Sequence, residues 1–234
     1  MKVFVLFLVP AMVLFGQTQA LSELVCEIRN PQTSGTRFRQ VLETIGEYLA
    51  LNVLEGLGKK EVAIRTLTGT DAKHRLVEEV PVLVTILRAG LPLNQGVQKI
   101  FPRSEVGFIA MSRNEETLKA KVEYISLPDL KDRSVILSDT MLATGGSIID
   151  AIQILKQYEP KRIFVISAIA SEPGIARIAQ LYPQVTVFAA AVDPSLNEKG
   201  YIIPGLGDAG DRCFGMKTHK AVDSEALVQR ASTN

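Results

Sequence analysis

The sequence predicts an α/β fold in which helices cover both faces of a largely parallel β-sheet. Short apolar segments recur along the chain, and amphipathic helical patterns separate them. Strands buried on both faces are apolar throughout, and strands that alternate with helices at this spacing form βαβ units. The predicted strands are Val80–Leu87, Val106–Met111, Val135–Leu137, Ile163–Ile169 and Val185–Val192, and the predicted helices between them are Leu91–Ile100, Ile148–Tyr158 and Gly174–Leu181.

The composition is that of a globular protein. Of the 234 residues, 47% are hydrophobic and 22% are charged, which excludes a disordered chain. The formal net charge of +1 argues against a dedicated binder of nucleic acid or of anionic membranes. Two cysteines and two histidines exclude a disulfide framework and argue against a Cys/His zinc site.

Two helices and one strand are predicted before the sheet. Ser22–Arg29 and Arg37–Leu57 carry apolar residues at helical spacing, with Thr36 as the cap of the second helix. Glu61–Leu67 alternates as a half-buried strand does. Because the sequence has no internal repeat and no low-complexity linker, we expect a single domain.

The first residues of the chain allow three interpretations. Val3–Phe15 is an apolar segment of thirteen residues, too short to cross a bilayer as a helix. The segment fits the apolar region of a secretory signal peptide, with Thr18 and Ala20 as weak cleavage-site residues. It also fits a buried strand or helix, or an extension from a start codon chosen too far upstream.

A strand–turn–helix segment carries residues suited to a phosphate. The strand ends at Ser138, Asp139 follows, and the small residues of Ala143–Ser147 lead into a helix. Ligands of open α/β sheets bind beyond the carboxyl ends of the strands, where glycines and the free amides of a helix start favour a phosphate. Asp139 would repel that phosphate and suits sugar hydroxyls or a metal-bridged group. A Walker loop is excluded, because no Gly-Lys-Ser/Thr follows, and the alternative is a structural turn.

This segment resembles the phosphoribosyl pyrophosphate (PRPP) loop of type I phosphoribosyltransferases, and in particular that of the uracil branch. The branch has one acid before the loop, as Asp139 is here, and usually a proline where this chain has Thr140. The resemblance implies that PRPP is bound by Asp139, Thr140, Met141, Leu142, Ala143, Thr144, Gly145, Gly146 and Ser147.

Two arginine-containing segments match the same family and extend the implied PRPP site. Ile86–Gly90 places Arg88 after an apolar strand, beside a turn of small residues. Arg113–Thr117 follows the next strand and resembles the family's arginine loop, although the family usually has tyrosine at Ser112. Arginines commonly form surface salt bridges, but these two follow strands at the same sheet edge as Asp139, which favours anion binding.

The segment Asn197–Arg212 contains the most specific match. Within it, Gly205–Gly210 fits a bare G-x-G-x-x-G pattern, but Pro204 precedes the pattern and too little chain follows for the βα unit of a dinucleotide fold. A glycine-rich surface turn is the structural alternative. The resemblance instead identifies the segment as the uracil pocket.

Main-chain groups of this segment suit a pyrimidine edge. Open amides at Gly207 and Ala209 and a carbonyl near Ile202 would mirror the acceptor–donor–acceptor edge of uracil, whereas cytosine would leave a buried amide unpaired. By resemblance, Ile202, Gly207, Asp208 and Ala209 bind uracil, and Asp208 also contacts PRPP.

The resemblance implies a type I phosphoribosyltransferase fold with a small hood, and the transfer of phosphoribose from PRPP to N1 of uracil, giving UMP and diphosphate. Asp208 and Arg113 are the implied catalytic residues. Because charge develops on the ribose and on the departing pyrophosphate, preorganised electrostatics should provide most of the acceleration. The implied cofactor is Mg²⁺ bound mainly through PRPP, and the implied assembly is a dimer or tetramer with GTP as an activator, although the sequence shows no GTP site.

The match runs from about Met12 to Lys217 and implies three parts of the chain. These are an apolar extension (1–11), the phosphoribosyltransferase domain (12–217) and a polar tail (218–234). Because the family works in the cytosol, where PRPP is made, we expect a cytoplasmic protein with an over-long start and Met12 as the initiator, and no membrane or nucleic-acid partner.

Three other functions stay open at this point. The first is a non-catalytic regulator of the same fold that senses PRPP and binds RNA or DNA; the near-zero net charge and the complete base-pocket segment argue against it. The second is a phosphoribosyltransferase for another base, such as xanthine or hypoxanthine. The third is an envelope-anchored binding protein.

Overall fold

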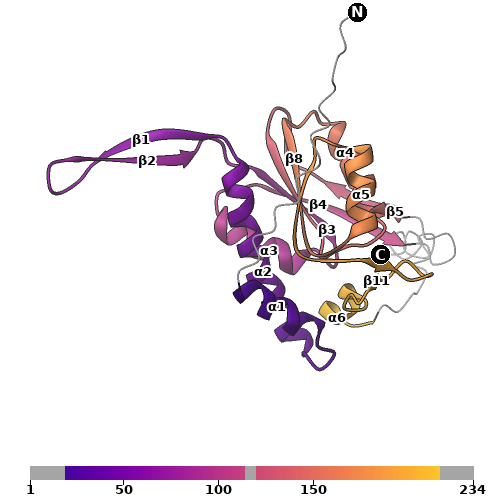
Figure 1. Ribbon diagram of the computed structural model, residues 1–234. Coiled ribbons are helices and arrows are strands. Elements are labelled where there is room, and N and C mark those ends of the chain that lie inside the picture. The colour runs from indigo at the N-terminus through magenta and orange to yellow at the C-terminus, as the bar shows by residue number, and fades with distance from the viewer. Residues whose placement is uncertain (1–18, 114–119, 217–234) are drawn as a thin grey trace, which may run out of the picture.

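Seven strands form a mixed sheet at the centre of the part of the chain that the computed structural model describes, residues 19–113 and 120–216 (Figure 1). The strands are β3 (Val82–Leu87), β4 (Val106–Arg113), β5 (Ala120–Ser126), β6 (Ser134–Ser138), β7 (Met141–Leu142), β8 (Arg162–Ser171) and β9 (Thr186–Asp193). Their order is β5-β4-β3-β6-β8-β7, and β9 also pairs with β8. Among these pairings only that of β4 with β5 is antiparallel.

The sheet buries apolar side chains on both of its faces. In β6, Val135 and Leu137 pack into one core and Ile136 into the other, and all three are fully buried. In β8, Val165 and Ile166 divide between the same two cores. Successive side chains of a strand point to opposite faces, so a sheet covered on both sides requires apolar residues without alternation. The predicted α/β fold class is confirmed.

Separate groups of helices cover the two faces. α1 (Gln19–Arg29), α2 (Gly35–Gly56) and α3 (Leu91–Ile100) pack on one face, and α4 (Gly146–Lys156) and α5 (Glu172–Leu181) on the other (Figure 1). The predicted cap of the second helix is wrong. Ser34 caps α2, because its hydroxyl accepts a hydrogen bond from the amide of Arg37 at 3.3 Å, and Thr36 lies inside the first turn.

α2 and α3 approach each other closely at two glycines. A Cβ atom at Gly46 would lie 2.1 Å from the carbonyl oxygen of Leu93, and one at Gly96 would lie 1.8 Å from that of Glu43. Only glycine permits this approach of two backbones. The contact fixes α3, which begins directly after the Arg88–Gly90 turn at the end of β3.

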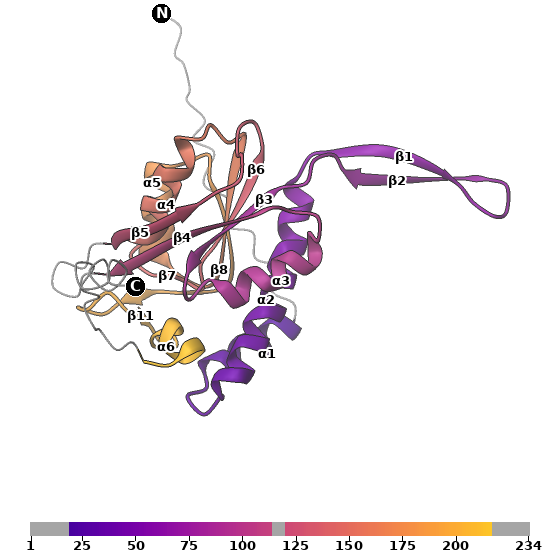
Figure 2. The same ribbon diagram turned by 180° about the vertical axis from the view of Figure 1, so that it is seen from behind.

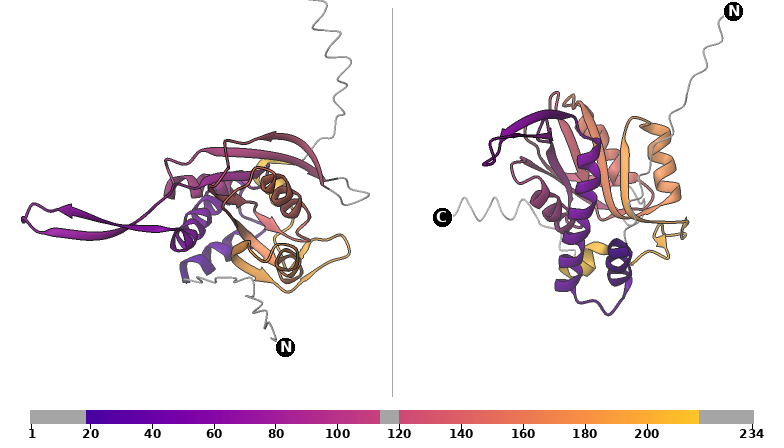
Figure 3. Two further views of the ribbon diagram at one scale, coloured as in Figure 1. Left: turned by 90° about the horizontal axis from the view of Figure 1, so that it is seen from above. Right: turned by 60° about the vertical axis from the view of Figure 1, so that its left-hand side comes forward.

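Between α2 and β3 the chain leaves the body of the molecule as a long hairpin (Figure 3). Its strands are β1 (Lys59–Arg65) and β2 (Asp71–Val77), which pair antiparallel over their full length. The predicted strand Glu61–Leu67 overlaps β1 but lies two residues too far along the chain. The sequence pattern does not predict β2, because charged residues and His74 interrupt its alternation.

Short elements form a small hood over the carboxyl ends of the sheet strands. β10 (Ser195–Leu196) and β11 (Ile202–Ile203) form an antiparallel pair, and α6 (Ala209–Phe214) follows. α6 contacts α2 and lies beside α1, so that the first and last described helices meet (Figure 2). The hood therefore connects the first and last parts of the described chain.

Some predictions fall on residues outside the described ranges. These are the apolar segment Val3–Phe15, most of the arginine loop after β4, and the polar tail 218–234. The proposed division into 1–11, 12–217 and 218–234 stays a prediction. Among the helices of the described residues, none has the length and apolar character needed to cross a bilayer.

Candidate functional site

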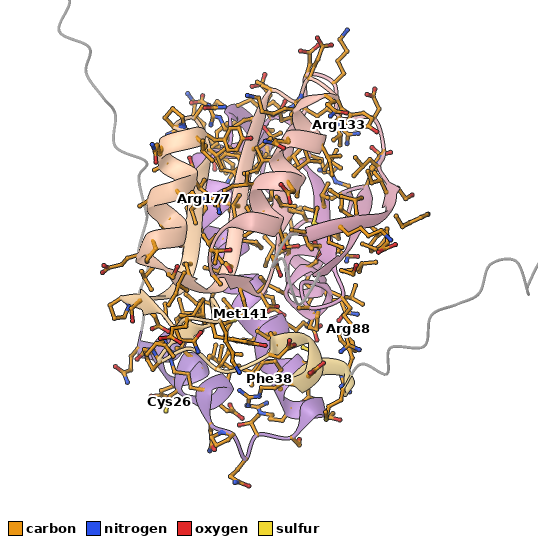
Figure 4. The ribbon with its side chains drawn as sticks, turned by 90° about the vertical axis from the view of Figure 1, so that its right-hand side faces the viewer. Cys26, Phe38, Arg88, Arg133, Met141 and Arg177 are labelled. Carbon is orange, nitrogen blue, oxygen red and sulfur yellow. The ribbon has the colours of Figure 1, made fainter. Side chains whose placement is uncertain are left out.

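A cleft of about 1010 Å³ lies at the carboxyl ends of β3, β4 and β6, beneath the hood. It brings together segments that are far apart in the sequence. Figure 4 shows Arg88 and Met141 near α6 at this end of the molecule, while Arg133 lies at the opposite end. The predicted site residues that line the cleft are Arg88, Asp139, Met141, Ala143, Thr144, Gly145, Gly146, Ser147, Ile202, Gly207, Asp208 and Ala209.

The start of α4 forms one wall of the cleft. Gly145 caps this helix in the left-handed conformation, with φ +78°, which favours glycine. Gly145, Gly146, Ser147 and Ile148 all line the cleft. The first amides of a helix have no partner within it, and they lie at the positive end of its dipole. This wall is therefore suited to a phosphate group.

Asp139 lies beside this wall, at the end of β6, and is half-buried. Desolvation raises the pKa of its carboxyl from 3.8 to about 7, although hydrogen bonds from the amides of Thr140 and Met141 act in the opposite direction. The carboxyl thus changes its charge near neutral pH. As a carboxylate it accepts hydrogen bonds from hydroxyl groups.

Two residues of the predicted PRPP loop do not line the cleft. The Thr140 side chain is fully buried, and its hydroxyl donates to the carbonyl oxygen of Ala89 at 2.7 Å. Leu142 is fully buried in the core beneath α4. Their side chains face the interior, so Thr140 joins the PRPP loop to the Arg88–Gly90 turn rather than presenting its hydroxyl to a ligand.

Arg88 lies between the sheet and the hood. Its Nη2 atom donates to Asp211 Oδ1 at 2.7 Å and to the carbonyl oxygen of Gly215 at 2.8 Å. The guanidinium carbon lies 6.0 Å from the ring centre of Phe214. The Nε atom is buried and makes no hydrogen bond within the described residues. Arg88 therefore brings a cation to the cleft, while its Nε atom stays buried without a hydrogen bond to any described residue.

Arg113 is the last residue of β4, and its side chain and residues 114–119 lie outside the description. Its predicted roles in PRPP binding and catalysis stay predictions. The neighbouring Ser112 lines the cleft, and its hydroxyl donates to Glu123 Oε1 on β5 at 2.9 Å.

The segment from Ile202 to Ala209 forms the wall on the hood side. Gly205 and Gly207 have φ values of +57° and +85°. A Cβ atom at Gly205 would lie 2.2 Å from the carbonyl oxygen of Ile202, so this turn requires glycine. Asp208 caps α6 by accepting a hydrogen bond from the amide of Asp211 at 2.8 Å. The turn thus presents main chain and one carboxylate to the cleft.

The carboxylates that line the cleft come from separate segments, namely Asp139, Glu198 and Asp208. Within the described residues, no three His, Cys, Asp or Glu side chains form a group that could hold a metal ion. Mg²⁺ keeps several waters and commonly binds through few carboxylates together with phosphate oxygens of a substrate. The residues present therefore fit a Mg²⁺ ion carried mainly by a phosphorylated ligand.

Three residues outside the predicted set support the hood. Arg29 and Asp193 form a salt bridge of 2.6 Å behind the turn at Gly205. Arg212 donates a hydrogen bond to the carbonyl oxygen of Leu206, and its guanidinium carbon lies 4.2 Å from the ring centre of Phe38. Asp193 directly follows the apolar segment Val185–Val192, as Asp139 follows its strand, and this position is a signal that the sequence does contain.

A family model for uracil phosphoribosyltransferase matches residues 15–216. The chain belongs to the uracil phosphoribosyltransferase family. A uracil phosphoribosyltransferase of Clostridium kluyveri is 44% identical over 192 residues, covering 81% of this chain and 91% of that protein. A uracil phosphoribosyltransferase of Aquifex aeolicus is 39% identical over 191 residues, which cover 82% of this chain and 92% of that protein.

One solved structure has a similar fold. The AQ2163 protein from Aquifex aeolicus superposes with a TM-score of 0.81 at 34% identity, covering 89% of this chain and 100% of that one. The predicted resemblance to the uracil phosphoribosyltransferase family is confirmed, and so is the type I phosphoribosyltransferase-like fold, with a central sheet that is mostly parallel.

Proposed function

We propose that the protein is a uracil phosphoribosyltransferase, which converts uracil and PRPP to UMP and diphosphate and so salvages a pyrimidine. One observation carries the proposal beyond family membership. The glycine turn before α4 and the glycine turn before α6 line the same cleft. One is suited to a phosphate and the other to a base, and both must be close for a sugar to join them.

Within this proposal the PRPP site extends from α4 to the end of β3. The amides of Gly145, Gly146 and Ser147 bind the 5′-phosphate, since the helix start favours an anion. Asp139 accepts hydrogen bonds from the ribose hydroxyls. Arg88, which lines the same cleft, stabilises the pyrophosphate through its positive charge.

The base site uses the hood turn. Main-chain groups of Ile202, Gly207 and Ala209 pair with the edge of uracil, and a mismatched base leaves a buried polar group without a partner. Asp208 lies between the two sites, where a carboxylate stabilises positive charge on the ribose or accepts the N1 proton.

Catalysis then depends on fixed charges. Positive charge grows on the ribose and negative charge on the leaving pyrophosphate, and preorganised groups stabilise both better than water does. Arg88 and Arg113 act on the leaving group in this scheme. Bound Mg²⁺ neutralises part of the pyrophosphate charge.

The remaining parts of the proposal come from the resemblance. They are dependence on Mg²⁺, assembly into a homo-oligomer, activation by GTP and a cytoplasmic location. Chelation with EDTA, sedimentation velocity, UMP formation with and without GTP, and cell fractionation test them in turn.

The central test is a product assay. The full chain is incubated with uracil, PRPP and Mg²⁺, and UMP is detected by chromatography, with cytosine, xanthine and hypoxanthine as parallel substrates. We expect UMP and little product from the other bases. A nucleotide formed only from a purine would contradict the assigned base, and binding of PRPP without any product would favour a regulator.

A further inference from the structure

An ion pair lies directly behind the turn that carries the proposed uracil contacts. The Arg29 guanidinium donates to the two carboxylate oxygens of Asp193, at 2.6 and 2.8 Å. Asp193 is 4% exposed. Neither Arg29 nor Asp193 is one of the described residues that line the cleft. The pair therefore acts on a ligand in the cleft only through the turn.

The ion pair binds both polar groups of the Gly205 main chain. The Gly205 amide donates to Asp193 Oδ2 at 2.9 Å, and Arg29 Nη1 donates to the Gly205 carbonyl oxygen at 2.8 Å. Gly205 is the residue whose positive φ and close approach to Ile202 begin the turn. The pair thus fixes the peptide groups on each side of the turn's first glycine.

Arg212 fixes the next residue along the chain. It donates to the carbonyl oxygen of Leu206 at 3.2 Å. It also donates to the carbonyl oxygens of Ile28 and Asn30, which flank Arg29 in sequence. Consecutive residues of the turn are therefore bound to the end of α1.

We propose that Arg29 and Asp193 are positioning residues for base recognition. This inference rests on the proposed function. A base read by main-chain groups depends on where the backbone lies, because no side chain can rotate to compensate. A displacement of about 1 Å at such a site reduces binding or rate by up to about 100-fold. Within the described residues, no hydrogen bond joins the pair to Gly145, Gly146 or Ser147, so affinity for the 5′-phosphate should change less than affinity for the base.

The test compares Michaelis constants for the two substrates. Asp193→Asn keeps the size of the side chain and removes its charge. We expect KM for uracil to rise by about tenfold to 100-fold and KM for PRPP to rise clearly less, because Asp208 is the only proposed PRPP contact that belongs to this turn. Arg29→Lys keeps the charge but loses the planar fork that reaches Asp193 and Gly205 together, so we expect an intermediate rise.

A double variant tests whether the two residues act as one unit. If the pair positions Gly205, then Arg29→Lys combined with Asp193→Asn should raise KM for uracil little more than Asp193→Asn does alone. Residues in one network show such non-additivity. If the fold-increases in KM for uracil of the two single variants multiply in the double variant, the proposal that the two residues act together is overturned.

The salt bridge between Arg37 and Glu27 provides a matched control. The Arg37 guanidinium donates two hydrogen bonds to the Glu27 carboxylate, at 2.6 and 2.8 Å, and Glu27 belongs to α1 as Arg29 does. This salt bridge is more exposed to solvent and makes no hydrogen bond to the described residues of the turn. We expect Glu27→Gln to leave both Michaelis constants and kcat within about twofold of the wild type.

The outcomes separate this inference from the proposed function. Unchanged KM for uracil in both variants of an active enzyme overturns the positioning role alone. Equal changes in both Michaelis constants, or a loss of kcat only, also overturn it, because they indicate general loss of structure. A wild-type chain that forms no UMP overturns both. If Asp193→Asn does not fold, Arg29→Lys decides.

Discussion

Arg88 on the turn after β3 and Asp211 in α6 form a 2.7 Å ion pair although 123 residues separate them. The pair joins the two walls of the cleft: the Arg88 turn belongs to the sheet, and α6 belongs to the hood. Both side chains are about one-third exposed, so the pair contributes little stability, on the order of 1 kcal/mol or less. Its importance lies in holding a cation at the edge of the site.

Replacing Arg88 should impair both PRPP binding and turnover. In Arg88→Ala we expect KM for PRPP to rise and kcat to fall, each by about tenfold or more, because a charge that stabilises the leaving group is lost. Steady-state kinetics with varied PRPP measures both. Arg133→Ala, which removes an arginine at the opposite end of the molecule, should leave them unchanged. Wild-type kinetics in Arg88→Ala would refute the assignment.

Asp139 predicts a pH dependence for the free enzyme. Since burial raises its pKa to about 7, the carboxylate becomes protonated as the pH falls below that value. We expect kcat/KM for PRPP to fall about tenfold per pH unit below pH 7, and Asp139→Asn to show a low, flat profile. An acidic limb that persists in Asp139→Asn would assign the titration to another group.

The same carboxyl affects stability with a definite sign. Between its unfolded pKa near 3.8 and its folded pKa of about 7, the folded protein holds the extra proton. The contribution of Asp139 to the free energy of unfolding therefore decreases as the pH rises through this range. Denaturant unfolding measures the free energy of unfolding at pH 5 and pH 7.5, and its decrease between the two pH values should be smaller in Asp139→Asn than in the wild type.

Gly205 should tolerate no side chain. In Gly205→Ala the new Cβ would meet the Ile202 carbonyl oxygen at 2.2 Å, in addition to the unfavourable positive φ. We expect a loss of about 2–4 kcal/mol of unfolding free energy. Gly69 at the hairpin tip also has a positive φ, +81°, but has open space around it, so Gly69→Ala measures the backbone term alone, about 1 kcal/mol. Equal losses in the two variants would show that the contact with Ile202 has no effect.

The Thr140 hydroxyl should matter for stability because its partner is buried. Thr140→Val keeps the shape and leaves the Ala89 carbonyl oxygen without this donor, so we expect a loss of about 1–3 kcal/mol. Thr44 makes a similar bond to the Gln40 carbonyl oxygen on the surface of α2, and Thr44→Val should change stability by less than about 0.5 kcal/mol. Urea denaturation compares the two, and a smaller effect at Thr140 would contradict the argument.

The strands of the central sheet could be predicted because burial on both faces leaves a simple pattern. β3, β6 and β8 each contain an unbroken apolar segment. The pattern fails where a strand is solvated. β2 and β5 carry charged residues along their length, and β5 is an edge strand whose Tyr124 is 58% exposed. Their pairing depends on the neighbouring strand and on turn geometry, which hydrophobic periodicity does not report.

The residues that line the cleft could be predicted from the sequence, but the residues that hold its walls in place could not. Asp139 and the glycines before α4 and α6 follow strand ends and fit known loop chemistry, so the sequence indicates them. Arg29 does not stand out, because a single arginine at a helix end is common. Its role depends on meeting Asp193 from 164 residues away, a relationship that only the folded chain provides. The inward direction of the Thr140 side chain is likewise visible only in the folded chain, because its partner is the Ala89 carbonyl oxygen, 51 residues away.

The attachment of the hood turn to α1 has a consequence for biosynthesis. The strands and α4 precede the hood in the chain, so a nascent protein still lacking its last segment contains the complete phosphate wall. Arg29 is synthesised early, but its partner Gly205 follows 176 residues later in the chain. Because such distant contacts form late, the hood turn would reach its final position only after the sheet and α1 have folded.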